Sequence, residues 1–131
     1  GCIGGLEAHQ PLARDVCEHA AAAALDDYRF SPVTADEVPD LLIEISRLTP
    51  PLPLHYEQPE ELPRRLHPML DGVVLRDGAH RATFLPQVWE KIPDPPAFLS
   101  HLCQKMGSPA NLWQRKVLQV EIYHVEEFHE N

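Results

Sequence analysis

Positive charge is scarce in this sequence. Its 131 residues include 11 Lys and Arg against 20 Asp and Glu, which gives a formal net charge of −9. A nucleic-acid-binding surface needs clustered cations that displace the counterions of the phosphates. The composition therefore argues against nucleic acid as a partner.

Long hydrophobic runs and cysteines are also scarce. The longest apolar run, residues 20–25, is far shorter than the ~18 residues of a membrane span, and no signal-peptide pattern is present. Cys2, Cys17 and Cys103 form an odd set at scattered spacings, which is typical of a reducing compartment and not of a disulfide framework. We therefore expect a soluble, cytoplasmic protein with no membrane partner.

Local metal-binding motifs are missing as well. The sequence has no C-x-x-C, no H-E-x-x-H and no clustered carboxylate triad. Cys17 with His19, and His101 with Cys103, are two residues apart on predicted helices, where side chains at that spacing point away from each other. The local motifs predict no metal site and no cofactor.

The first part of the chain predicts a helix, a turn and a strand. The length suits one domain, residues 1–131, with one core. The predicted helix begins at Pro11 and ends near Tyr28. Residues 34–37 read as a capping box that opens a helical turn, which Pro39 ends. A strand is predicted over residues 41–48, because apolar and polar residues alternate there.

An irregular connection over residues 50–70, with one helical turn near 60–66, leads to the clearest local pattern of the chain. Two runs of β-forming residues flank Asp77 and Gly78, a pair typical of a tight hairpin turn. With Arg76 opposite Ala79, one face of this hairpin would carry the apolar residues Val73, Leu75, His80, Ala82 and Phe84. That face is predicted to contact the core.

The last third predicts helix, turn and strand. Asp94 and Pro95 are typical of a helix start and Gly107 of its end, with a buried stripe of Phe98, Leu99, Leu102 and Met106. Ser108 and Pro109 predict a brief turn that reaches Trp113, and residues 117–128 predict a final strand. Trp89 and Trp113 are expected to be core anchors. The fold class is α+β, a mainly antiparallel sheet with flanking helices.

The opening residues Gly1-Cys2-Ile3-Gly4-Gly5 are the sharpest candidate for chemistry. Successive glycine amides can form an anion-binding nest that lowers the pKa of a thiol, so Cys2 is a candidate nucleophile. The alternative is that Cys2 is a small buried residue. A nucleophile also needs a base, which the fold would have to supply from His9, His55, His67 or His80.

Candidate ligand-binding side chains lie elsewhere in the chain. Arg76, Arg81 and Thr83 share the second hairpin face and could bind an anion, although exposed charges at a sheet edge also discourage aggregation. Glu44 is either a site carboxylate or part of a polar strand face. Asp71 precedes the hairpin and is most simply part of a turn.

Five segments together resemble the AMMECR domain family, which in prokaryotes is protein A of the AmmeMemoRadiSam system. They are Gly1-Cys2-Ile3-Gly4, residues 41–46 with Pro50-Pro51, residues 71–75, residues 81–90 and residues 125–128. The resemblance implies an α+β fold with two lobes, and partners that are a Memo-like protein and a radical SAM protein. It implies no defined activity.

The family's signature reads Leu-Arg-Gly-Cys-Ile-Gly, and its last four residues match residues 1–4. The preceding Leu-Arg, and an upstream segment that supplies a helix and a strand, are missing, so the chain is expected to be a partial AMMECR-type domain. Gly5 stands where a hydroxyl residue is usual in the family.

Three functional hypotheses stay open. The first is an accessory or ligand-binding domain whose site includes Gly1, Gly4, Gly5, Glu44, Asp71 and Arg81. The second is a cysteine-dependent enzyme with Cys2 as nucleophile, the Gly4 and Gly5 amides as oxyanion donors and a distant histidine as base. The third is a non-catalytic interaction module whose motifs specify packing.

Overall fold

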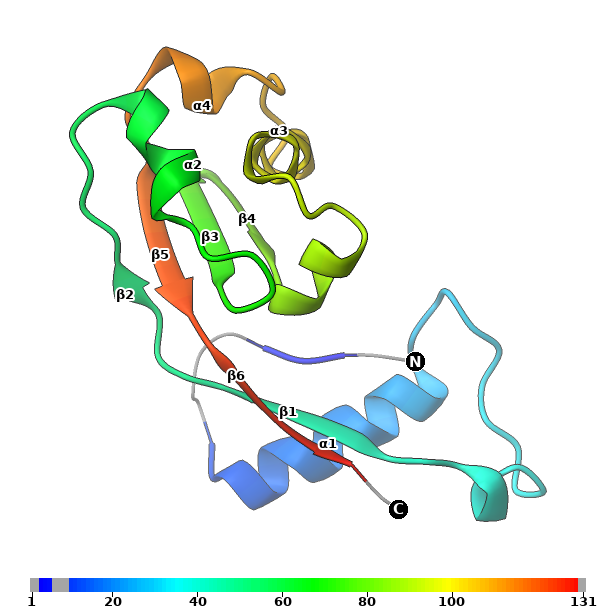
Figure 1. Ribbon diagram of the computed structural model, residues 1–131. Helices are drawn as coiled ribbons and strands as arrows, with labels where there is room; N and C mark the ends of the chain where they lie inside the picture. The colour runs from blue at the N-terminus through cyan, green and yellow to red at the C-terminus, as the bar shows by residue number, and fades with distance from the viewer. Residues whose placement is uncertain (1–2, 6–9, 130–131) are drawn as a thin grey trace. The chain divides into compact units, whose positions relative to one another are not determined.

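The computed structural model describes residues 3–5 and 10–129, and the chain divides into two compact units (Figure 1). Unit 1 comprises Gly1–Arg47 with Glu127–Asn131, and unit 2 comprises Leu48–Glu126. Helices combine with antiparallel strand pairs, so the predicted α+β class is confirmed. Among the described residues, no helix is both long and apolar enough to cross a membrane.

Unit 1 contains α1 (Leu12–Leu25), the 3-10 turn η1 (Val38–Asp40) and most of strand β1 (Glu44–Leu48), which pairs with β6 (Val125–His129); Leu48 and the first two residues of β6 belong to unit 2. Pro11, predicted as the first residue of this helix, is instead its N-cap residue, and α1 ends at Leu25 and not near Tyr28. The Glu37 carboxylate accepts from the Thr34 N–H at 3.1 Å and from the Thr34 hydroxyl at 2.9 Å. The bond from the Glu37 side chain back to the Thr34 N–H is the one expected of the acidic residue in a capping box, so this part of the prediction is confirmed. The prediction that Pro39 ends the turn is wrong, because Pro39 lies inside η1.

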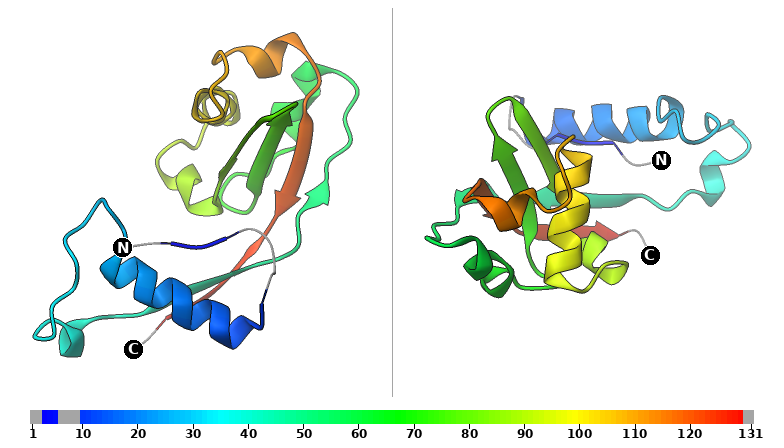
Figure 2. Two further views of the ribbon diagram at one scale, coloured as in Figure 1. Left: turned by 180° about the vertical axis from the view of Figure 1, so that it is seen from behind. Right: turned by 90° about the horizontal axis from the view of Figure 1, so that it is seen from above.

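Unit 2 is organised around a four-stranded sheet with the order β2-β5-β3-β4. Its strands are β2 (Leu52–Pro53), β3 (Gly72–Asp77), β4 (His80–Phe84) and β5 (Gln119–Tyr123). The remaining elements are η2 (Pro59–Glu61), α2 (Leu62–Arg65), η3 (Pro86–Glu90), α3 (Pro95–Lys105) and α4 (Leu112–Arg115). Figure 2 shows α3 running across the sheet.

The hairpin is confirmed, but its turn lies one residue later than predicted. Asp77 pairs with His80, so Gly78 and Ala79 form the turn, and Gly78 takes a φ of 61° that favours glycine. Arg76 therefore lies opposite Arg81 and not opposite Ala79. The predicted core face is still correct. The pairing differs from the predicted one by two residues, and side chains alternate between the two faces with a period of two, so the same residues stay on the core face.

Two further predictions need correction. The predicted strand 117–128 is two strands, β5 and β6, which are interrupted at His124, and the short strand β2 was not predicted. The turn after Gly107 gives a helix that begins only at Leu112. By contrast, α3 is confirmed at both ends, since the Asp94 carboxylate accepts from the Ala97 N–H at 3.2 Å and Gly107 has a φ of 86°.

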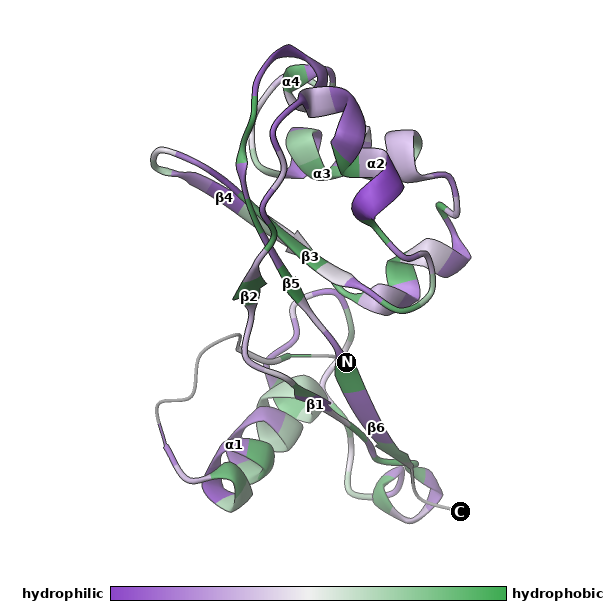
Figure 3. Cartoon of the chain, turned by 60° about the vertical axis from the view of Figure 1, so that its left-hand side comes forward, coloured by the Kyte–Doolittle hydropathy of each residue, from purple (hydrophilic) through white to green (hydrophobic). Residues whose placement is uncertain are grey.

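The hydrophobic core of unit 2 lies between the helices and one face of the sheet. Trp89 and Phe98 are fully buried and stack at 3.7 Å with an interplanar angle of 5°, which confirms Trp89 as a core anchor. The whole predicted stripe of α3 is buried, and so is Trp113. Figure 3 shows hydrophobic residues along β3 and β5 and also on α1. On α1, however, none of them is buried.

Candidate functional site

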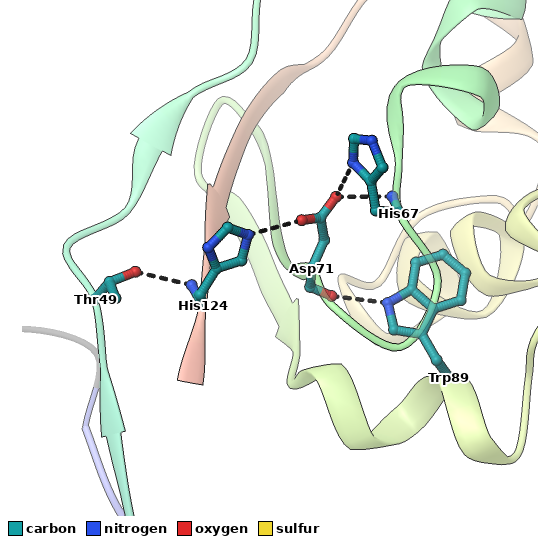
Figure 4. Close-up of polar contacts among 5 residues, drawn as sticks. All are labelled: Thr49, His67, Asp71, Trp89 and His124. Carbon is teal, nitrogen blue, oxygen red and sulfur yellow. Dashed lines mark hydrogen bonds and ion pairs between the residues drawn. The ribbon is translucent and has the colours of Figure 1, made fainter. Parts of the chain in front are cut away.

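Asp71 lies where the chain enters β3, and its carboxylate is the most enclosed charge of unit 2. The side chain is 3% exposed, and two histidines hold its two oxygens (Figure 4). His124 Nε2 lies 3.0 Å from Oδ1, while His67 donates its backbone N–H to Oδ2 at 2.8 Å and places Nδ1 3.2 Å from the same oxygen. We call Asp71, His67 and His124 the Asp71 cluster.

The loop before β3 positions His67 and Asp71. The N–H groups of Leu70 and Asp71 both donate to the His67 carbonyl, at 3.2 and 3.0 Å. Met69 takes a φ of 70°, which completes this tight reversal. Trp89 Nε1 donates to the Asp71 carbonyl at 2.8 Å and fixes the loop to the core. The turn predicted at Asp71 is therefore present, and the same turn aims its carboxylate at two imidazoles.

His124 occupies the break between β5 and β6. Its backbone N–H donates to Thr49 Oγ1 at 2.8 Å, and its carbonyl accepts from the Thr49 N–H at 2.9 Å. The pairing with Thr49, together with the bond to Asp71, fixes both the backbone and the ring of His124. These contacts account for the interruption of the predicted long strand.

Tyr123 supports the site from β5 and is almost fully buried. Its ring lies over Gly72, where an added Cβ would come within 2.3 Å of Tyr123 Cε2. The hydroxyl lies 2.9 Å from Thr83 Oγ1 and donates to the Phe84 carbonyl at 3.2 Å. Burial raises the pKa of Tyr123, and the Thr83 hydrogen bond opposes that rise. Gly72 is thus required by the close approach of an aromatic ring.

The cluster can present two hydrogen-bond acceptors to solvent. The side chains of His67 and His124 are 72% and 51% exposed, although the carboxylate between them is buried. A carboxylate accepts hydrogen bonds, so the hydrogen-bonding network assigns the N–H of His67 to Nδ1 and that of His124 to Nε2. In the neutral rings, His67 Nε2 and His124 Nδ1 then carry the free lone pairs.

Of the predicted site residues, only Asp71 belongs to this cluster. Gly1, Cys2 and His9 lie outside the described residues. Gly4 and Gly5 are exposed residues of unit 1, with open space where a Cβ would lie and without a left-handed φ, so the structure shows no steric demand for glycine there. Glu44 is exposed on β1 of unit 1.

Arg81 is exposed on β4 of unit 2, opposite Arg76. Arg76 itself is paired, since its Nε donates to Glu121 Oε1 at 2.8 Å. Of the other candidate bases, His80 contacts the Met106 carbonyl at 3.2 Å, and His55 is exposed next to β2. Anion binding by Arg81 stays a prediction.

The sequence gives His67 a role only as a possible base for Cys2, and it indicates no role for His124. The His67–Asp71 spacing of four residues around a proline offered a local sign of a side-chain-closed turn. His124 offered none, because 53 residues separate it from Asp71. Within the described part of the chain, no three His, Cys, Asp or Glu side chains meet in a group that could hold a metal ion.

Comparisons with known proteins agree on one family. The family model described as AMMECR1 matches residues 1–128. A Thermofilum pendens protein is 39% identical over 133 residues, which cover 98% of this chain and 61% of that protein. Protein PH0010 of Pyrococcus horikoshii is 36% identical over 135 residues, which cover 99% of this chain and 63% of that protein.

A solved structure gives the same result. The crystal structure of the uncharacterized protein PH0010 from Pyrococcus horikoshii matches with a TM-score of 0.80 and 34% identity, covering 92% of this chain and 60% of that one. This chain therefore spans less than two thirds of the length of both relatives.

Proposed function

Because the chain belongs to the AMMECR1 family, we propose that it is an accessory, ligand-binding domain that acts in the cytoplasm with a Memo-like protein and a radical SAM protein. The partners come from the resemblance of its motifs to that family. The observation that carries the binding role is the Asp71 cluster, in which one buried carboxylate orients two exposed imidazoles. We place the binding surface at this cluster.

The chemistry of the cluster suits a partner group that donates hydrogen bonds. Two oriented imidazole nitrogens accept N–H or O–H groups, and the negative charge of Asp71 below them favours a cationic donor. The Cys17 and Cys103 thiols are both free, which is consistent with the reducing cytoplasm.

The different exposure of Asp71 and His67 allows a binding role to be tested separately from a structural one. Asp71 closes its loop and is buried, so its replacement changes stability whatever its function. The His67 ring is 72% exposed, and the backbone N–H that it contributes to Asp71 remains in any variant. A substitution of the His67 side chain therefore tests binding with little effect on folding.

The experiment is calorimetric titration of the full chain with the Memo-like protein and with the radical SAM protein of the same genome. We expect the wild type to bind at least one of them. The His67→Ala variant should bind it at least about 10-fold more weakly, which is about 1.4 kcal/mol, with a melting temperature within about 2 °C of wild type. His101→Ala is the matched control, because this exposed histidine of α3 lies outside the Asp71 cluster and contacts the Ala97 carbonyl of its own helix at 3.0 Å.

Two outcomes would contradict separate parts of the proposal. If the wild type binds neither protein, the assignment of partners is wrong. If His67→Ala binds as the wild type does, or if His101→Ala is weakened equally, the cluster is not the binding surface.

A further inference from the structure

A row of donors crosses the sheet of unit 2 on the face opposite the core face. The pairing register places Arg76 of β3 between Arg81 of β4 and Gln119 of β5. Like charges directly opposite each other on neighbouring strands destabilise a sheet. The chain has only 11 basic residues against 20 acidic ones, yet two of them lie opposite each other here. Arg76 is ion-paired with Glu121, and Arg76 and Gln119 are the residues of this row that line a groove.

A groove of about 520 Å³ lies at one end of this row. It lies beside β2, where the Leu54 N–H still donates to the Val120 carbonyl at 2.8 Å, and beyond that bond the Tyr56 hydroxyl accepts from the Leu118 N–H at 2.7 Å. Its volume is in the range of small-molecule sites, ~300–1,000 Å³. The groove-lining residues that matter here are Leu54, His55, Arg76, Val117, Gln119 and Glu121.

The groove is amphipathic and places its charges at one side. Val117 is 47% exposed and, with the half-buried Leu54, provides apolar surface. The Arg76 side chain is 37% exposed, and its Nε donates to Glu121 Oε1 at 2.8 Å. A guanidinium has five N–H donors, so its outer edge can still bind a carboxylate.

Glu121 restricts which anion fits. Its carboxylate neutralises the same guanidinium, so the pair has no excess positive charge to offset the larger desolvation cost of a ligand carrying two negative charges. A phosphate ester is therefore disfavoured relative to a monocarboxylate. The apolar lining favours a ligand with a short hydrocarbon part.

We propose that this groove, the Arg76 groove, binds a small amphipathic monocarboxylate. The carboxylate binds the outer edge of Arg76, next to Gln119, and the hydrocarbon part contacts Leu54 and Val117. This inference goes beyond the proposed function, because it depends neither on the Asp71 cluster nor on a partner protein.

The test is an NMR titration of the ¹⁵N-labelled full chain with hexanoate, with hexanol and hexyl phosphate as comparison probes. We expect hexanoate to cause saturable shifts at the amides of Arg76, Gln119 and Glu121, with an affinity at least about 5-fold higher than that of either comparison probe. The proposal is overturned if hexanoate causes no saturable shift there, or if hexanol binds equally well.

Three variants make the test specific. Arg76→Gln should lower the affinity for hexanoate at least about 10-fold, while Glu121→Gln should raise it, since it frees the guanidinium from a competing carboxylate. Arg115→Gln, at the end of α4 and not among the groove-lining residues, is the control that should change nothing. If the pair of Arg76 and Glu121 is purely structural, Glu121→Gln gains no affinity for hexanoate. A loss of affinity or no change in Glu121→Gln would therefore contradict the proposal, and this result can be read even if Arg76→Gln folds poorly.

Discussion

Both units form helices and strands, but among the described residues the fully buried apolar side chains belong to unit 2. All 17 buried hydrophobic residues belong to unit 2, whereas ten of the 14 exposed large hydrophobic residues belong to unit 1, counted over the described residues. Unit 1 nevertheless has a helix of 14 residues, because its run of alanines favours a helix locally. The difference shows that a local sequence pattern can form a helix without burial, while the buried hydrophobic residues among those described stabilise unit 2.

The largest expected difference between the two units is in the rate of amide hydrogen exchange. Amides of β3 and β5 should open only on global unfolding, because both strands pair on both sides within the sheet. Amides of α1, a helix without a buried residue, should exchange at least about 100-fold faster. Mass spectrometry of peptides from each element measures this, and similar protection of α1 and β3 would contradict the comparison.

A matched pair of phenylalanines gives the next largest effect. Phe98 is fully buried between Trp89 and Phe84, so Phe98→Ala should lower the free energy of unfolding by about 3–5 kcal/mol. Phe30 of unit 1 is 59% exposed, and Phe30→Ala should change that energy by no more than about 0.5 kcal/mol. Urea denaturation of both variants checks this, and equal losses would show that unit 1 also has a core.

A matched pair of glycines sharpens the same contrast. Gly72→Ala would force a Cβ against the Tyr123 ring, and we expect a loss of about 1–3 kcal/mol. Gly5→Ala in unit 1 meets open space and should be close to neutral. The check is again urea denaturation. If the double variant Gly72→Ala/Tyr123→Leu is no more stable than Gly72→Ala, the clash is not the cause of the loss.

The sequence predicted what depends on neighbouring residues and missed what depends on distant ones. The caps of α3 and the apolar face of the hairpin follow from short patterns, and the structure confirms them. Strand β2 and the break at His124 depend on pairing with β5 and with Thr49, so no local pattern indicates them. The two-residue shift in the pairing of the hairpin has a different cause, since Asp-Gly and Gly-Ala can both form the turn.

The candidate site shows the same limit. Asp71 was predicted as a turn residue and as a site residue, and the structure gives its carboxylate two histidine contacts. One of them, His67, is local, and the other depends on the fold. Arg81 and Glu44 were proposed from the chemistry of their side chains alone, and the structure does not bring either into the Asp71 cluster. Cys2 lies outside the described residues, so its role stays a prediction.

Alkaline pH should weaken unit 2 by a smaller amount. Burial raises the pKa of Cys103, and also raises those of Tyr56 and Tyr123 against the effect of their hydrogen bonds. A group whose pKa is raised in the folded state contributes stability below its unfolded pKa and loses it as pH rises through the folded one. We therefore expect the urea midpoint to fall above about pH 8.5, where unfolded cysteine ionises, and again above about pH 10.

The variant Cys103→Ala should remove the first part of this alkaline fall, because it removes the buried thiol. Tyr28→Phe is the control from unit 1, since that ring is 95% exposed, and it should leave the alkaline fall unchanged. A urea midpoint that is unchanged between pH 8 and pH 10.5 would contradict the linkage to buried groups.

The smallest expected effect lies in unit 1, where hydrogen bonds act without burial. The hydrogen bond from the Thr34 backbone N–H lowers the pKa of Glu37, and the bond from the Thr34 hydroxyl lowers it by a smaller amount. A lowered pKa in the folded state gives stability above the unfolded pKa, about 4.3, which is lost as pH falls through the folded one. Thr34→Ala removes only the hydroxyl and should raise the pKa of Glu37 part of the way, while Thr34→Ser should keep it low. NMR titration of the carboxyl group measures the pKa of Glu37 in each variant. Equal pKa values in Thr34→Ala and Thr34→Ser would show that unit 1 lacks the capping turn in solution, because a Glu37 side chain that is not held at residue 34 cannot distinguish serine from alanine.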